Sequence, residues 1–154
     1  MKVRKKRCSV SQQAELLVYK YAQEEREKVE AKHPIISKKK INYREYPACV
    51  VACYSKVGNH HIECAKSGAK DNNPYSSPVL IKALTGLGGI GKYNNFCKNK
   101  IGSCAEPHAA EKVLLRLRNK QTNLSTLYFS KTIRPRTNKI KSYCSNCKAI
   151  FPTL

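Results

Sequence analysis

Three cysteines in two short stretches constrain this chain more than any other feature. Cys104 lies in GSCAEPHAAE at residues 102–111, and Cys144 and Cys147 bound the stretch CSNC. Cysteine thiolates are common zinc ligands, and the C-x-x-C spacing lets two of them reach one ion. Three ligands fill three positions of a tetrahedral zinc and leave the fourth open, which is the arrangement that a catalytic ion needs.

Glu106 follows Cys104 by two residues and has two interpretations. Ser103 and Glu106 match the capping box S-x-x-E, and Pro107 agrees with a helix start because proline is tolerated in the first turn. Alternatively, the carboxylate reaches a water in the open metal position and passes its proton to a leaving group. A helix start would also lower the pKa of the Cys104 thiol and favour its metal-binding form.

The charge of the chain is strongly positive and unevenly distributed. It has 30 Lys and Arg against 10 Asp and Glu, which gives a formal net charge of +20. From residue 98 to the end there are twelve Lys or Arg and two acids. Such a field attracts polyanions, so we expect a nucleic acid as the partner. A solvated basic surface is the alternative interpretation.

Periodicity predicts the elements in the order α-β-β-α-β-α. Apolar residues repeat at helical spacing over 11–31, and two strand-like runs in 47–68 flank the hairpin signal Gly58-Asn59. That turn would place Cys53 opposite Cys64. The segment 106–120 reads as a second helix, 124–133 as a strand, and a short helix follows CSNC. This order predicts an α/β fold with a short mixed sheet flanked by helices.

The segment from Gly86 to Tyr93, GLGGIGKY, matches part of a phosphate-binding loop but lacks its metal ligand. The pattern G-x-x-x-x-G-K requires Ser or Thr at the next position, and Tyr93 stands there. We therefore interpret the segment as a glycine-rich loop at the rim of a site. The apolar run at 79–87 before it is assigned no type of element.

The length of 154 residues predicts one domain over 11–154, preceded by a basic tail at 1–10. No apolar run approaches 18 residues, so no membrane span is expected. Eight cysteines without a secretory signal indicate reduced thiols and a cytoplasmic protein, with the nucleus as an alternative.

Cys104-Ala105-Glu106 followed by Cys144-x-x-Cys147 resembles the zinc-dependent cytidine deaminase-like superfamily, whose signature is H-x-E or C-x-E followed by P-C-x-x-C. Tyr143 stands where that signature has proline. The element order is similar as well, and the small size and basic charge look most like the bacterial toxin-type nucleic-acid deaminases. The resemblance implies a three-layer deaminase-like fold.

The resemblance also implies a reaction. Zn²⁺ would be held by Cys104, Cys144 and Cys147, and zinc-bound hydroxide would attack C4 of cytosine, or C6 of adenine, in nucleic acid. Glu106 would carry protons to the amine as it leaves as ammonia. Cytosine is expected before adenine, and single-stranded DNA or RNA before double-stranded DNA. A toxin of this kind would act inside a target cell and would have an immunity protein as its partner; we expect a monomer.

Two other functions are compatible with the same residues. His108 lies one helical turn after Cys104 and would close a structural Cys3His zinc site in a non-enzymatic nucleic-acid-binding domain. A deaminase of free nucleosides or nucleotides is the other, although such an enzyme needs no strong basic field.

Residues just before CSNC are the expected contacts to the nucleic acid. Four of them would bind phosphates: Arg134, Arg136, Lys139 and Lys141. Tyr143 would stack on a base, unless it is a core aromatic.

Overall fold

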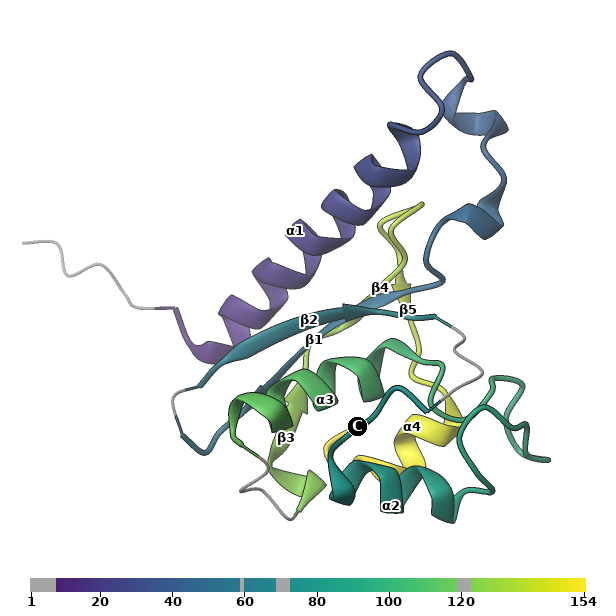
Figure 1. Ribbon diagram of the computed structural model, residues 1–154. Coiled ribbons are helices and arrows are strands. Elements are labelled where there is room, and N and C mark those ends of the chain that lie inside the picture. Colours follow the sequence, from purple (N-terminus) through teal and green to yellow (C-terminus); the bar gives the residue numbers. More distant parts are fainter. Residues whose placement is uncertain (1–7, 59, 69–72, 119–122) are drawn as a thin grey trace, which may run out of the picture.

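The computed structural model describes residues 8–58, 60–68, 73–118 and 123–154, and shows an α/β fold of helices on both faces of an antiparallel sheet (Figure 1). The helices are α1 (Val10–Glu30), α2 (Pro78–Gly86), α3 (Ala105–Arg116) and α4 (Ser145–Ile150). The strands are β1 (Val50–Ser55), β2 (Ile62–Lys66), β3 (Leu127–Phe129), β4 (Thr132–Ile133) and β5 (Ile140–Lys141). Three 3₁₀ turns lie at Lys38–Lys40, Tyr43–Glu45 and Leu124–Thr126. No helix in the described part of the chain is long and apolar enough to cross a membrane.

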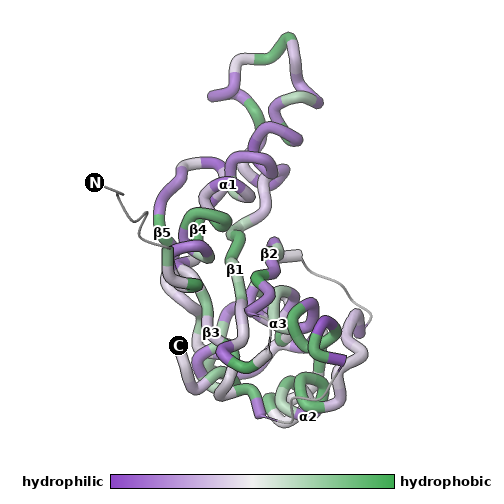
Figure 2. Tube along the Cα trace, turned by 90° about the vertical axis from the view of Figure 1, so that its left-hand side faces the viewer, coloured by the Kyte–Doolittle hydropathy of each residue, from purple (hydrophilic) through white to green (hydrophobic). Residues whose placement is uncertain are grey.

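β1 is the central strand, and all six of its residues are buried. Val50, Ala52 and Tyr54 face α1, and Val51 and Cys53 alternate with them toward α2, α3 and α4. This alternation follows from the two-residue period of a strand. Both faces of β1 are apolar because helices cover both faces of the sheet. Hydrophobic residues accordingly concentrate on β1 and α2 in Figure 2.

α1 begins one residue before the predicted start, at Val10, because Ser9 and Gln12 form a capping box. Ser9 and Val10 therefore belong to the cap and the helix, Cys8 precedes the cap, and residues 1–7 of the predicted tail lie outside the described residues. The buried face of α1 contains Ala14, Val18 and Ala22, as the apolar repeat predicted. Leu17, also in that repeat, is 39% exposed.

Beyond α1 the chain makes a long excursion, residues 31–49, before it enters β1. We call this segment the arm; Figure 1 shows it extending away from the sheet together with the end of α1. A small cluster of Val29, Ile41 and Tyr46 joins the arm to α1, and His33 pairs with Glu45 at 2.6 Å. The arm is therefore packed against the helix rather than held at its ends alone.

The β1–β2 hairpin is present, but its predicted register is wrong. Ala52, not Cys53, lies opposite Cys64, and Cys53 lies opposite Glu63. The connection is longer than two residues, and both Gly58 and His60 have positive φ; Asn59 lies outside the described residues. A shift of one residue sends Cys53 and Cys64 to opposite faces of the sheet, so they do not form a cross-strand pair.

The strand predicted at 124–133 is divided by a bulge. Tyr128 pairs with Tyr54, whereas Ile133 pairs with Val50, so one extra residue lies on this side. Ser130 fills the bulge, since its hydroxyl accepts a hydrogen bond from the Ala52 amide at 2.9 Å. β3 and β4 thus flank the same side of β1, and β5 continues the sheet beyond β4.

Three further predictions need correction. Every strand pairing in the described residues is antiparallel, so the sheet differs from the mixed sheet that was expected. The apolar run at 79–87 is the helix α2, which begins with Pro78 in its first turn. The helix predicted at 106–120 ends at Arg116, and residues 119–120 lie outside the described part.

Candidate metal centre and basic pocket

The thiols of Cys104, Cys144 and Cys147 lie together, with their sulfur atoms all within 4.8 Å of one another. The Sγ atoms of Cys104 and Cys144 are 3.2 Å apart, and those of Cys144 and Cys147 are 3.5 Å apart. Cys104 is 8% exposed and Cys147 is 1% exposed. The sequence prediction that these three residues meet is confirmed, and the cluster can hold a metal ion.

Two helix starts bring the cluster together. Cys104 is the N-cap of α3, and Cys144 is the N-cap of α4. Amide groups at a helix start favour negative charge, and thiolates there are stabilised. The capping box predicted at Ser103 is wrong, because the Ser103 hydroxyl donates instead to the Lys100 carbonyl at 2.7 Å.

The three thiols share their protons unequally. The pKa of Cys144 is lowered because its hydrogen bonds with the Cys104 and Cys147 thiols favour its thiolate. The pKa of Cys104 is raised by its hydrogen bond with Cys144, contrary to the expectation from its helix start, and that of Cys147 is raised by hydrogen bonds with Cys104 and Cys144. A divalent cation would remove this inequality, because a coordinated thiol is deprotonated outright.

The geometry fits a tetrahedral ion. Zn–S bonds of about 2.3 Å at tetrahedral angles place two sulfurs about 3.8 Å apart. The two measured distances of 3.2 and 3.5 Å are slightly shorter, so the sulfurs need to separate by only a few tenths of an ångström. Three thiolates also form a soft ligand set, which favours zinc over magnesium or calcium.

Glu106 lies buried beside the sulfurs. It is 2% exposed, and its Oε2 has no hydrogen-bond partner in the described part of the chain. Burial raises the pKa of this carboxyl, the nearby Cys144 raises it further, and a hydrogen bond with Cys147 opposes the rise. A buried, unpartnered carboxylate oxygen is unusual in a folded protein, and it indicates a group poised for a ligand or a proton.

His108 does not join the cluster. Its Nδ1 is 3.3 Å from the Tyr75 hydroxyl, and its Nε2 is 3.3 Å from the Gly68 carbonyl. Its ring stacks on Tyr75 with centroids 5.4 Å apart. Among the described residues the candidate metal-binding group consists of the three cysteines alone. His108, which the alternative interpretation made the fourth ligand, is not part of this group.

A network of asparagine hydrogen bonds lies beside the cluster, and no pattern in the sequence predicted it. Asn146, between the two cysteines of α4, is 3% exposed. Its amide donates to the Asn99 carbonyl at 3.1 Å, and its oxygen accepts from the Asn94 amide at 2.8 Å. Asn99 in turn donates to the Cys104 sulfur at 3.5 Å. The glycine-rich loop and the residues after it are thereby attached to the sulfurs.

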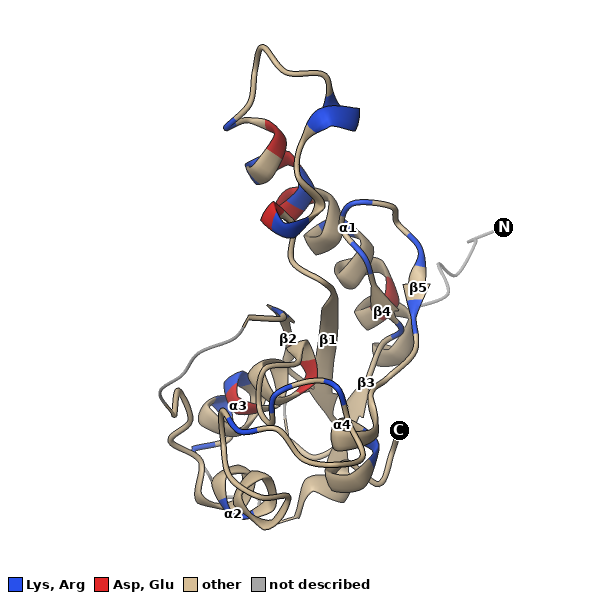
Figure 3. Ribbon diagram, turned by 90° about the vertical axis from the view of Figure 1, so that its right-hand side faces the viewer, with Lys and Arg blue, Asp and Glu red and all other residues tan. Residues whose placement is uncertain are grey.

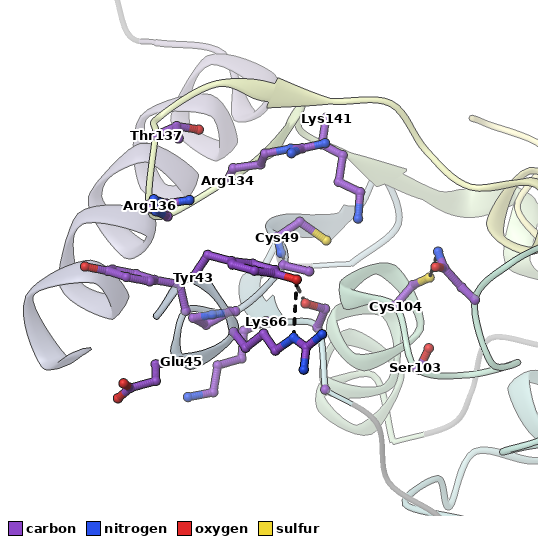
Figure 4. Close-up of a pocket in the computed structure, with 17 residues that line it drawn as sticks. Tyr43, Glu45, Cys49, Lys66, Ser103, Cys104, Arg134, Arg136, Thr137 and Lys141 are labelled. Atoms are coloured by element: carbon purple, nitrogen blue, oxygen red, sulfur yellow. Dashed lines mark hydrogen bonds between the residues drawn. The ribbon is translucent and has the colours of Figure 1, made fainter. Parts of the chain in front are cut away.

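A pocket of about 730 Å³ opens beside Cys104 (Figure 4). One wall is the arm, from Tyr43 to Cys49, and the other is the β4–β5 hairpin, with Arg134, Arg136 and Lys141. Asn99, Ser103 and Cys104 also line it. Figure 4 shows Tyr43 reaching in from one side and Lys141 from the other.

The pocket includes three of the five residues predicted to contact nucleic acid. Arg134, Arg136 and Lys141 line it, and Lys139 is exposed on the same hairpin but is not part of the lining. Tyr143 is half-buried; its hydroxyl donates to the Ser130 carbonyl at 2.5 Å, and burial raises its pKa to about 12. Its position agrees with a core aromatic and does not favour base stacking.

Sequence reasoning missed two further cations that line the pocket, Arg44 of the arm and Lys66 of β2. The single lining acid, Glu45, is paired with His33. The basic composition of 38–44, KKKINYR, is the signal that could have found the wall that the arm forms. Nothing in it, however, indicates that the arm folds back toward the β4–β5 hairpin.

No family model, curated protein or solved structure matches this chain significantly. The chemistry of the site must therefore be argued from its own residues.

Proposed function

We propose that this protein is a zinc-dependent deaminase that hydrolyses the exocyclic amine of a base, cytosine before adenine, in nucleic acid. One observation carries the proposal. Three metal-competent thiols lie together beside a buried carboxylate that has one unpartnered oxygen, and one of the thiols, Cys104, lines a pocket that five cations also line: Arg44, Lys66, Arg134, Arg136 and Lys141. This combination unites a metal, a proton carrier and an affinity for polyanions in one place.

Cys104, Cys144 and Cys147 would hold the zinc ion. Bound there, the ion leaves a fourth position for water and lowers the pKa of that water toward ~7. Glu106 Oε2 would take a proton from the attacking water and deliver it to the exocyclic nitrogen. The second proton of the water would end on the adjacent ring nitrogen, so that ammonia leaves as the carbonyl forms. Burial of Glu106 excludes bulk water that would compete for this proton.

The basic walls would supply the substrate affinity. Within the described residues, Arg134, Arg136 and Lys141 are paired with no carboxylate, so their charges are available to phosphates. Because Cys104 lines the same pocket, a strand whose phosphates bind these cations would bring a base close to the proposed metal. A base inside a duplex would first have to leave its stack.

The decisive experiment replaces Glu106 by alanine and glutamine. Wild type and variants are incubated with single- and double-stranded DNA, RNA, cytidine and cytidine monophosphate, and the products are read by sequencing or chromatography. We expect the variants to lose about 10²–10⁴-fold in deamination rate and to keep their zinc, measured by elemental analysis. Glu111→Gln is the matched control, because that buried carboxylate on the same helix accepts from the Ser76 and Ser77 amides instead.

Two outcomes would contradict the proposal. Absence of any deamination by wild type carrying one tightly bound zinc would favour a structural zinc site in a nucleic-acid-binding domain. Deamination confined to cytidine and its monophosphate would move the activity to free nucleosides or nucleotides.

A further inference from the structure

The two walls of the pocket come from segments far apart in the sequence, and each contributes unpaired positive charge. Arg44 of the arm and Arg136 of the β4–β5 hairpin are both exposed, and both line the pocket. Figure 3 shows Lys and Arg gathered on the hairpin around β5 and on the arm. Glu45, the acid that lines the pocket, is paired with His33 at 2.6 Å.

A second, smaller hollow of about 360 Å³ continues the first along the arm. It is lined by Lys38, Lys39 and Glu30 of the arm side, and it shares Tyr46, Arg136 and Thr137 with the first pocket. Glu30 is paired with Lys38 at 2.8 Å, whereas Lys39 and Arg136 have no carboxylate partner among the described residues. The basic surface thus extends from Cys104 past Arg136 to Lys39, well beyond the space that one nucleotide fills.

Tyr43 lies between these cations as an exposed aromatic ring. It is 59% exposed, and the Arg44 guanidinium lies 5.7 Å from the ring centre while its Nε donates to the Tyr43 hydroxyl at 3.2 Å. An exposed ring beside a chain of cations is the combination by which proteins bind single strands, since bases stack on the ring and phosphates bind the cations.

The arm holds these groups in place before any ligand arrives. Ile41 and Tyr46 are buried against Val29 of α1, on either side of Tyr43 and Arg44. Preorganised groups lose less conformational entropy on binding, so a wall anchored in this way gives more affinity than a free tail of the same charge.

We propose that the arm and the β4–β5 hairpin form a track for one strand of nucleic acid, which runs from Cys104 between Arg44 and Arg136 to Lys39, with a base stacked on Tyr43. The track rests on the proposed function in one respect only, which is that the base nearest Cys104 is the one that reacts at the metal. We expect the track to take a single strand rather than a duplex, because only an unpaired base can stack on Tyr43.

Binding is measured by fluorescence anisotropy with labelled single-stranded 4-mers and 12-mers of DNA and RNA, the 12-mer duplex, and cytidine monophosphate as a competitor. We expect Arg44→Ala and Arg136→Ala each to weaken 12-mer binding several-fold and to reduce the salt slope by about 0.7. Lys39→Ala should weaken the 12-mer and leave the 4-mer unchanged, because only the longer strand reaches the second hollow.

Tyr43 is tested by a conservative pair. Tyr43→Ala should weaken binding about tenfold, whereas Tyr43→Phe should bind like wild type because the stacking surface remains. Lys82→Ala and Lys148→Ala are the charge-matched controls, since both lysines are exposed on helices and line neither hollow. All replaced side chains are exposed, so thermal unfolding should be unchanged.

The track would be overturned if the controls weakened binding as much as the track variants, if the duplex bound as tightly as the single strand, or if cytidine monophosphate competed as well as the 12-mer. Binding is measured on Glu106→Ala protein as well, so the two proposals fail separately. Binding that depends on the track residues, without any deamination, would support the track and contradict the deaminase proposal. Deamination that is unchanged by Arg44→Ala and Arg136→Ala would support the deaminase proposal and contradict the track.

Discussion

At the scale of single residues, the cysteine spacing was the part of the sequence that carried most information. Thiolates bind zinc at a few characteristic spacings. The C-x-x-C motif and a third cysteine at a helix start therefore predicted that the three cysteines lie together. Glu106 was predicted from its distance to Cys104 along the chain. Its burial and its unpartnered Oε2, by contrast, depend on packing that no local pattern describes.

The asparagines around the cluster give the first prediction. Asn146→Ala removes hydrogen bonds to Asn94 and Asn99, and Asn99 contacts the Cys104 sulfur. Outer-shell partners of this kind orient ligands, so we expect zinc affinity to fall about tenfold or more. Competition with a coloured chelator measures the affinity, and the visible spectrum of the Co²⁺ form reports the ligand geometry.

Asn95→Ala is the matched control for Asn146→Ala, because Asn95 is exposed next to Asn94 and has no part in the network. Equal zinc affinities in wild type, Asn95→Ala and Asn146→Ala would show that the network does not act on the metal.

At the scale of elements, Glu25 links α1 to the sheet. It is 3% exposed and pairs with Lys28 at 2.7 Å and with Lys66 of β2 at 2.8 Å. Burial would raise its pKa, but the hydrogen bonds to the two lysines outweigh burial, and the pKa is lowered below its ordinary 4.5. The stabilisation is therefore present above pH 4.5 and is lost as the pH falls through the lower pKa of the folded state.

The variant Glu25→Gln tests this link. At pH 6 we expect its free energy of unfolding to be lower than that of wild type by about 1 kcal/mol, a small value because both lysines are more than half exposed. The difference should shrink at pH 3, because the stabilisation is lost as the pH falls through the lowered pKa of Glu25. Urea unfolding at the two pH values measures it, and a difference that does not change with pH would contradict the assignment.

The strands show where local patterns mislead. The Gly58-Asn59 signal predicted a hairpin correctly, but it could not fix the register, because a connection longer than the signal moves every pair by one residue. The run 124–133 contains a bulge because Ser130 bonds to the Ala52 amide from a distant part of the chain. Such a contact is invisible in a window of ten residues.

At the scale of the whole molecule, the metal site lies against the larger of the two main cores. Cys104 and Cys147 belong to the same cluster as Leu80, Leu114 and Phe151, and a separate cluster joins α1 to the sheet. The fold therefore buries a substantial apolar core that needs no metal, whereas α3 and α4 meet at the sulfurs.

Removal of zinc should consequently lower stability without unfolding the protein. We expect a chelator to reduce the thermal unfolding temperature by several degrees, because the ion binds only the folded cluster. The far-ultraviolet circular dichroism of the metal-free protein should stay close to that of the zinc form. Complete loss of helical signal on chelation would mean that the ion is a structural clip.

The sequence by itself determined the elements of α1 and α3, the cysteine cluster and the sign of the surface charge, because these depend on local periodicity, ligand chemistry and composition. The tertiary structure decided the register of the strands, the place of His108 away from the sulfurs, and the pocket itself. The arm and the β4–β5 hairpin line one pocket, and Ile41 and Tyr46 pack the arm against α1. Contacts between such distant residues are set by the packing of the whole chain, which no short stretch of sequence contains.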